Sequence, residues 1–251
     1  MRFPRHFPAR GLLAAALLGG TACLAGVYTV DPVSMTLSTS APQGEFRVLN
    51  ENTRTLRLQA DVERWTQDAN ENVQAPSTDF IVSPRFVDVP AQGGQTVRIA
   101  WRHPQSKAIE GSYRVMFREV MGPDDSRAVH KTALNYSIPL FVEPSAGGNA
   151  VLAWTAFILA PRQVRLRVEN RGAVHAKLAW HALQAIGNPG VELAGEEDFT
   201  ALTRVSPMRY VLAGAYREFD MPVHGKIRVG DQLSLWVDID GIRKIIVLTA
   251  Q

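Results

Sequence analysis

The chain offers few side chains that could act as nucleophiles or bind a metal ion. Its one cysteine, Cys23, lies in an N-terminal leader that we expect to be removed, which excludes a thiol nucleophile and a thiolate metal ligand in the mature protein. His175 and His181 are six residues apart, which in a strand separates them by about 20 Å, too far for one metal ion. Each is interpreted as a surface or turn residue. The sequence has no glycine-rich phosphate loop after a strand pattern and no serine in a nucleophile-elbow pattern. We therefore predict that the protein is not an enzyme and has no catalytic residue, metal site, cofactor or small-molecule substrate.

Arginines within strand patterns could perform a different task, which is to bind a carboxylate group. Four of them lie in or beside the strand patterns of the first half of the chain: Arg85, Arg98, Arg114 and Arg118. A guanidinium group can hold a terminal carboxylate by two parallel hydrogen bonds. The alternative is that these arginines are solvated on the outer faces of strands. The acidic run at residues 196–198 is interpreted as a solvated loop, with calcium binding as the minor alternative.

One stretch, residues 131–144, combines an apolar row with a signal for a sheet edge. Every second position carries an apolar or aromatic side chain, so an extended backbone places four of them on one face: Leu134, Tyr136, Ile138 and Leu140. Pro139 has no N–H group to give to a ladder, which favours an edge strand. An apolar edge strand promotes aggregation unless it is covered. Either the row enters the incomplete core of another protein, or it faces the core of its own domain.

The elements that must position these residues are short strands. From residue 27 to residue 144, runs with a period of two alternate with turn residues, and no convincing helix occurs. After a small-residue stretch at 144–149, which we interpret as a linker, the second half repeats this style. Trp65, Trp101, Trp154, Trp180 and Trp236 lie within strand patterns and are interpreted as core residues. We predict an all-β fold with two sandwich domains, at residues 26–144 and 145–251.

Residues 1–25 have the pattern of a secretory signal peptide. Three arginines precede a short apolar run and small residues follow it, so cleavage is expected after Ala25 or Ala22. A lipid anchor on Cys23 is disfavoured, because Gly20 stands where a large aliphatic residue is expected. Removing the three leader arginines from the 27 basic side chains leaves 24, which balance the 24 acidic ones. Bulk charge therefore gives no support for binding to nucleic acid or to an anionic membrane.

Several stretches together resemble the periplasmic pilus-assembly chaperones. In the first half they are DFIVSPRFVDV, QTVRIAW, EGSYRVMFREV and NYSIPLFVEP, and in the second half RVENRGAVHAKL and YVLAGAYREFDMP. The resemblance runs from about residue 27 to the C-terminus, and SYRVMFRE and IPLFVEP are most similar to the alternative or archaic branch. It implies two immunoglobulin-like domains joined at an angle, in the periplasm. It also implies that the last strand of the first domain completes a pilus subunit, which the chaperone delivers to an outer-membrane usher.

The resemblance also assigns residues. It places the donated row at Leu134, Tyr136 and Ile138, with a backward extension to Thr132 and His130. Glu110 stands where the family has a glutamate in an interdomain salt bridge, and Asp238 or Asp240 would supply the acidic partner of the second domain. The strand ends in Glu143-Pro144 where the better-known branch has Arg-Pro. The basic residues that anchor a subunit's carboxylate in that branch are replaced by Ser34 and Pro139. Arg98, Arg85 or Arg114 would then replace that anchor, or backbone groups would hold the end of the subunit.

Two other classes of protein fit the composition. A secreted two-domain adhesin or structural pilus subunit would need a free donor segment near the mature N-terminus or an interrupted sandwich. A secreted hydrolase or carbohydrate-binding sandwich would need clustered carboxylates or an exposed aromatic platform. An exposed donor edge also makes a self-capping homodimer of the free chaperone plausible.

Overall fold

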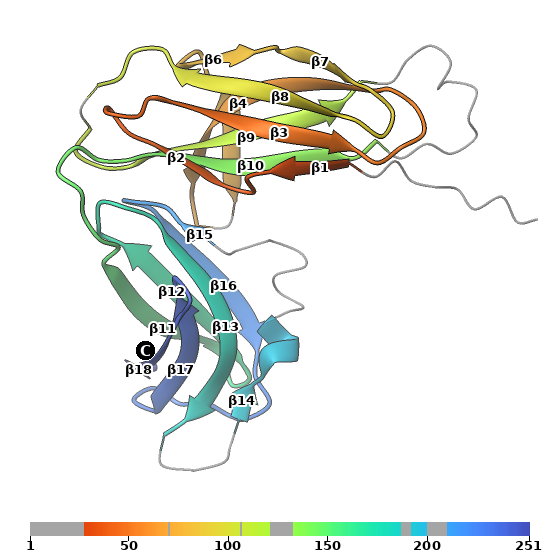
Figure 1. The fold of residues 1–251 in the computed structure, drawn as a ribbon. Coiled ribbons are helices and arrows are strands. Elements are labelled where there is room, and N and C mark those ends of the chain that lie inside the picture. Colours follow the sequence, from red (N-terminus) through yellow and green to blue (C-terminus); the bar gives the residue numbers. More distant parts are fainter. Residues whose placement is uncertain (1–27, 70, 106, 121–132, 187–191, 200–209) are drawn as a thin grey trace, which may run out of the picture.

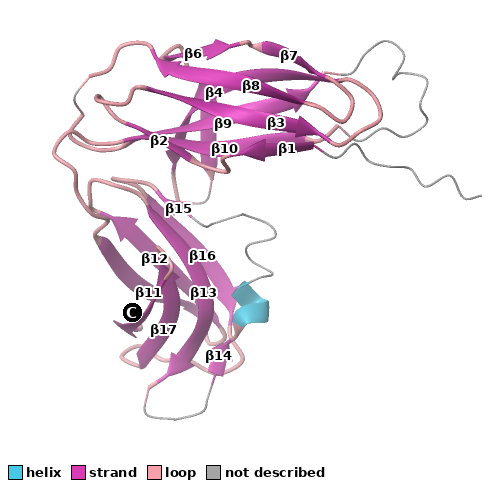
Figure 2. Cartoon of the chain, in the orientation of Figure 1, coloured by secondary structure: helices cyan, strands magenta, loops and turns pink. Residues whose placement is uncertain are grey.

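Strands make up nearly all of the regular structure in the computed structural model (Figure 2). The structure describes residues 28–69, 71–105, 107–120, 133–186, 192–199 and 210–251. The chain forms two immunoglobulin-like β-sandwich domains that meet at an angle, with the connection at one end of both (Figure 1). The prediction of an all-β fold with two sandwiches is therefore confirmed. One short helix, at residues 196–199, was not predicted.

The first domain packs a four-stranded sheet against a six-stranded one. Its strands are β1 (Tyr28–Asp31), β2 (Met35–Leu37), β3 (Gln43–Asn50), β4 (Leu56–Gln67), β5 (Asn72–Pro76), β6 (Phe80–Ser83), β7 (Phe86–Val89), β8 (Gly94–Trp101), β9 (Gly111–Glu119) and β10 (Asn135–Val142). The first sheet has the order β1-β3-β8-β6, and the second has the order β2-β10-β9-β4-β5, with β7 also paired to β4. Alternate residues of the strands point inward, and the core includes Phe46, Val97, Val115 and Phe117.

The second domain is a smaller sandwich of the same kind. Its strands are β11 (Leu152–Ala160), β12 (Gln163–Asn170), β13 (Ala176–Ala185), β14 (Glu192–Ala194), β15 (Tyr210–Val211), β16 (Tyr216–Pro222), β17 (Gln232–Ile239) and β18 (Ile242–Thr249). The sheets have the orders β11-β12-β16 and β14-β13-β17-β18, and β15 pairs with β13. A separate core, with Leu166, Leu178, Leu183 and Leu235, lies between them. No helix among the described residues is both long and apolar enough to cross a membrane.

Strand β10 is covered on one side along its length but on the other side only at its end. It pairs antiparallel with β9 from Asn135 to Val142. On its other side, β2 pairs in parallel with Leu140–Val142. Within the described part of the chain, no strand pairs with the other edge of residues 135–139. Backbone groups on that edge are therefore available to another strand, and the free part ends at Pro139, which has no N–H to donate.

Candidate functional site

The predicted apolar row of β10 is divided between the core and the surface. Ile138 and Leu140 are 4% and 0% exposed and belong to the core of the first domain. The prediction that they are offered to another protein is therefore wrong, because their strand parity turns them toward the facing sheet. Leu134, directly before β10, is 37% exposed. The backward extension to Thr132 and His130 lies outside the described residues.

Tyr136 is partly buried, between the core residue Ile138 and the exposed residue Leu134. Its ring packs edge-to-face against Tyr28, with 4.9 Å between the ring centroids, and its hydroxyl donates to the Tyr28 carbonyl over 2.8 Å. The Tyr28 hydroxyl in turn donates to the Leu134 carbonyl over 3.0 Å. These bonds fix the start of β10 against β1. Leu134 is thus held in place directly before the strand, one edge of which is only partly paired. Tyr136 exposes only part of its side chain.

Arg114 lies on the outer face of β9, directly across the ladder from Pro139. Its guanidinium carbon is 3.7 Å from the ring centroid of Trp65, and Tyr210 of the second domain lies 5.9 Å from it. One terminal nitrogen donates to the Ser137 carbonyl over 3.3 Å, whereas the buried Nε has no hydrogen-bond partner. Burial lowers the pKa of Arg114 to about 10, so the group stays cationic at neutral pH. Among the described residues no carboxylate forms an ion pair with it. Because Nε is itself buried, any further acceptor would have to bond with the terminal nitrogens of the guanidinium group.

The other two arginines proposed as anchors lie elsewhere. Arg85 forms an ion pair with Asp61 over 2.7 Å. Arg98 is on β8, in the other sheet, where its exposed side chain lies 3.7 Å from Glu45. The structure therefore does not bring the three arginines together. Arg114 alone of the three contacts the second domain.

Glu110 joins the two domains, but with a partner that the sequence analysis missed. Its nearly buried carboxylate lies 2.8 Å from Nδ1 of His175 and accepts a hydrogen bond from the His175 backbone N–H over 3.2 Å. The imidazole stacks on Phe141 of β10, with 3.8 Å between ring centroids. His175 lies in the loop directly before β13 with a partly exposed side chain, as interpreted, but its place at the domain junction was not predicted. No sequence signal linked Glu110 to a histidine 65 residues away.

The two aspartates expected at this junction have partners within the second domain. Asp238 lies 2.9 Å from His181 and 3.0 Å from Arg243. The hydrogen bond from Arg243 has the largest effect and, with that from His181, lowers the pKa of Asp238. Asp240 accepts a hydrogen bond from the Lys177 backbone N–H over 2.8 Å. The prediction that either forms the interdomain bridge is therefore corrected.

A second interdomain contact involves the end of β4. Gln67 donates to the Tyr210 carbonyl and accepts from the Leu212 backbone N–H, both over 2.9 Å. Beside it, Trp65, Phe141 and Leu212 form a small apolar cluster between the domains. Phe141 follows Leu140 on the opposite face of β10. One strand therefore contributes to the core, the domain junction and the free edge.

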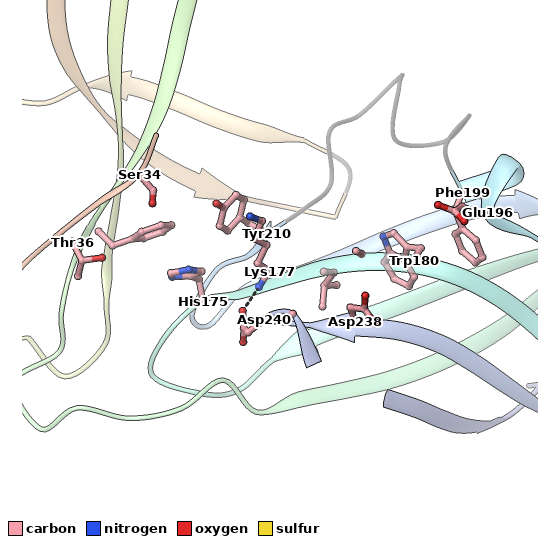
Figure 3. A pocket seen from close by; sticks show the side chains of 14 residues that line it. Ser34, Thr36, His175, Lys177, Trp180, Glu196, Phe199, Tyr210, Asp238 and Asp240 are labelled. Atoms are coloured by element: carbon pink, nitrogen blue, oxygen red, sulfur yellow. Dashed lines mark hydrogen bonds between the residues drawn. The ribbon is translucent and has the colours of Figure 1, made fainter. Parts of the chain in front are cut away.

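A cavity of about 730 Å³ opens between the domains beside this junction (Figure 3). From the first domain, Ser34 and Thr36 line it together with Phe141, and from the second domain, His175, Lys177 and Tyr210 do so. Ser34 is the position at which the resemblance places an anchoring arginine in related proteins, and among the described residues that line this cavity Lys177 is the one lysine or arginine. The described residues contain no group of three or more His, Cys, Asp or Glu side chains that could hold a metal ion.

Comparison with protein families fits this architecture. Residues 28–147 match the family model described as the pili and flagellar-assembly chaperone, PapD N-terminal domain. The fold thus defines a protein of two immunoglobulin-like β-sandwich domains, the first of which carries the free strand edge. Its first domain therefore belongs to the PapD-like chaperone family. Comparison with curated proteins found no match.

Solved structures share the fold over nearly the whole chain at low identity. One is the CsuC–CsuE chaperone–tip adhesion subunit complex from archaic chaperone-usher Csu pili of Acinetobacter baumannii. The TM-score is 0.62 at 18% identity, covering 90% of this chain and 99% of that one. The Pseudomonas aeruginosa CupB2 chaperone gives 0.53 at 18% identity, covering 89% and 100%. The Salmonella enterica SafA pilin in complex with the SafB chaperone gives 0.54 at 15% identity, covering 88% and 93%. At these identities the likeness shows the fold.

Proposed function

We propose that this chain is a periplasmic chaperone that binds and stabilises pilus subunits by donating a strand, and that it delivers them to an outer-membrane usher. The observation that carries the proposal is the half-covered strand β10, whose residues 135–139 pair only with β9 among the described strands. The family match of the first domain supports this choice of partner, as do the complexes of a chaperone with a tip adhesion subunit and with a pilin among the similar structures.

The free edge of β10 suits a partner that lacks a strand. The partner's edge would take up the open backbone groups of residues 135–138, and its incomplete core would receive Leu134 and the side chains before it. Each fully buried apolar side chain contributes about 1.5–3 kcal/mol, before the cost of ordering the segment. Ile138 and Leu140 keep their places in the chaperone core and hold the strand rigid. This mechanism needs no cofactor, and release would occur by exchange with another subunit's strand.

Arg114 is proposed to hold the terminal carboxylate of the subunit. It lies across the ladder from Pro139, the position at which the resemblance places an anchoring lysine in related proteins. The cation would thus have moved from β10 to the neighbouring strand while remaining beside the same stretch of backbone. Trp65 and Tyr210 hold the guanidinium group on the cleft side of the sheet.

Substituting Leu134 tests strand donation without disturbing the core. We expect Leu134→Asp to fold normally, because this side chain is 37% exposed, but to lose a candidate pilin that co-purifies with the native chain from the periplasm. An aspartate in the subunit's core would bury a charge without a partner. The matched control is Val73→Asp, at a 45% exposed position on β5, the opposite edge strand of the same sheet. Equal pilin recovery with both variants would contradict strand donation through Leu134.

A further inference from the structure

Strand β18 of the second domain has a second open edge, distinct from that of β10. It is the last strand in the order β14-β13-β17-β18, and it pairs with β17 in an unbroken register from Ile242 to Thr249. Only beyond it does Gln251 bond with β11, donating to the Ala156 carbonyl over 3.0 Å. Within the described residues no strand pairs with the outer edge of Ile242–Thr249, and β11 approaches this edge only at its C-terminal end, where Ala156 and Ala250 form an isolated parallel bridge. β18 lies at the edge of its sheet opposite β14 (Figure 1).

The hydrogen bonds at the end of β18 show which backbone groups face the open edge. Ala250 bonds toward β17, donating to the Asp231 carbonyl over 2.9 Å, whereas Gln251 bonds away from it. Because the bonding direction alternates along a strand, the odd-numbered residues direct their N–H and C=O groups outward. These residues are Arg243, Ile245 and Val247. They offer a row of unpaired donors and acceptors to another strand.

The same odd-numbered residues give this edge an apolar surface. Ile245 and Val247 are 52% and 60% exposed, and Ile245 lies across the ladder from Trp236. The Trp236 indole nitrogen is buried and has no hydrogen-bond partner. Scattered exposed apolar residues are common, but an apolar row on an open strand edge is a template for pairing. The edge and its face therefore present one continuous docking surface.

We propose that a second copy of this chain occupies this surface, by antiparallel pairing of β18 with its own copy around a two-fold axis at Ile245. In this register Ile245 meets its symmetry mate, and Arg243 lies opposite Val247. The outward backbone groups of both strands then face each other. The two cations of β18, Arg243 and Lys244, both precede Ile245, so the axis places them at opposite ends of the pair and no cation opposes another.

This pairing is independent of the proposed subunit site. β10 and its free edge lie in the first domain, and the β18 edge lies across the second sheet from β14. A dimer formed through β18 would therefore carry two unobstructed β10 edges. A dimer formed by capping β10 would instead hide both of them.

Sedimentation analysis of the mature chain over a wide range of concentrations tests the proposal. We expect a monomer–dimer equilibrium, and we expect Ile245→Lys to weaken it at least tenfold, because the substitution places two cations against each other at the axis. Val229→Lys, at a 78% exposed position outside the strands, is the control and should leave the equilibrium unchanged. Ile245→Cys exported to the periplasm should form a disulfide-linked dimer, whereas Val229→Cys should not.

The contrary outcomes are distinct. A native chain that is monomeric at every concentration would overturn the proposal. So would a dimer that Leu134→Asp dissociates and Ile245→Lys does not, since that dimer would use the β10 edge. Subunit binding should persist in Ile245→Lys, so a failure of this proposal leaves the proposed chaperone function intact.

Discussion

Replacing Ile138 by aspartate is expected to unfold the first domain. The side chain is 4% exposed within the core of that domain, so the substitution buries a carboxylate without a partner. The cost is several kcal/mol, a large part of the roughly 5–15 kcal/mol that stabilises a typical domain. Loss of the cooperative thermal transition, followed by circular dichroism, would report it. Subunit binding should disappear as a consequence of unfolding.

The conservative substitution Ile138→Val gives the matched comparison. Removing one methylene from a core costs about 0.5–1.5 kcal/mol, so this variant should stay folded and bind subunit as the native chain does. A folded Ile138→Asp variant that fails only in subunit binding would show that Ile138 is donated to the partner. That result would restore the full alternating row predicted from the sequence.

Replacing Arg114 by methionine is expected to weaken subunit binding while leaving the fold stable. Methionine keeps much of the packing against Trp65 and removes a cation whose pKa is lowered by burial. Because that burial disfavours the charged form, the unfolding midpoint at neutral pH should stay the same or rise. Hydrogen bonds to charged groups contribute about 1.5–3 kcal/mol, so we expect a loss of about 10- to 100-fold in subunit affinity.

Two comparisons isolate the carboxylate in this prediction. Arg98→Met, on the other sheet, should bind the subunit normally. A subunit whose C-terminus is amidated should bind the native chain more weakly and bind Arg114→Met with no further loss. If amidation weakens both chaperones equally, Arg114 does not hold the carboxylate.

The sequence predicted the elements of this fold well, because a period of two is a local signal. It identified β10 as an edge strand from Pro139 and from the apolar row. It did not determine how far the edge is free, because the cover comes from β2, a three-residue strand about 100 positions earlier. Nor did it separate Leu134 from Ile138 along the same row. That division depends on where the facing sheet ends.

Contacts between the domains were the least predictable part. Trp65 is buried as expected, but at the domain junction, and Trp236 lies on the outer face of its sheet. Both tryptophans are out of phase with the alternating apolar rows of their strands, a signal in the sequence that places them on the opposite faces. The pairing of Glu110 with His175 depends on the angle between two separately folded sandwiches. Alternation within a strand carries no information about that angle.

Hydrogen exchange on β10 tests strand donation most directly. In the free protein, backbone amides at residues 134–138 that point to the open edge should exchange rapidly, whereas those bonded to β9 should be protected. Binding of a pilus subunit should protect the open-edge amides, because a new strand would accept their hydrogen bonds. Unchanged exchange at these amides in a saturated complex, with protection appearing elsewhere, would contradict strand donation by β10.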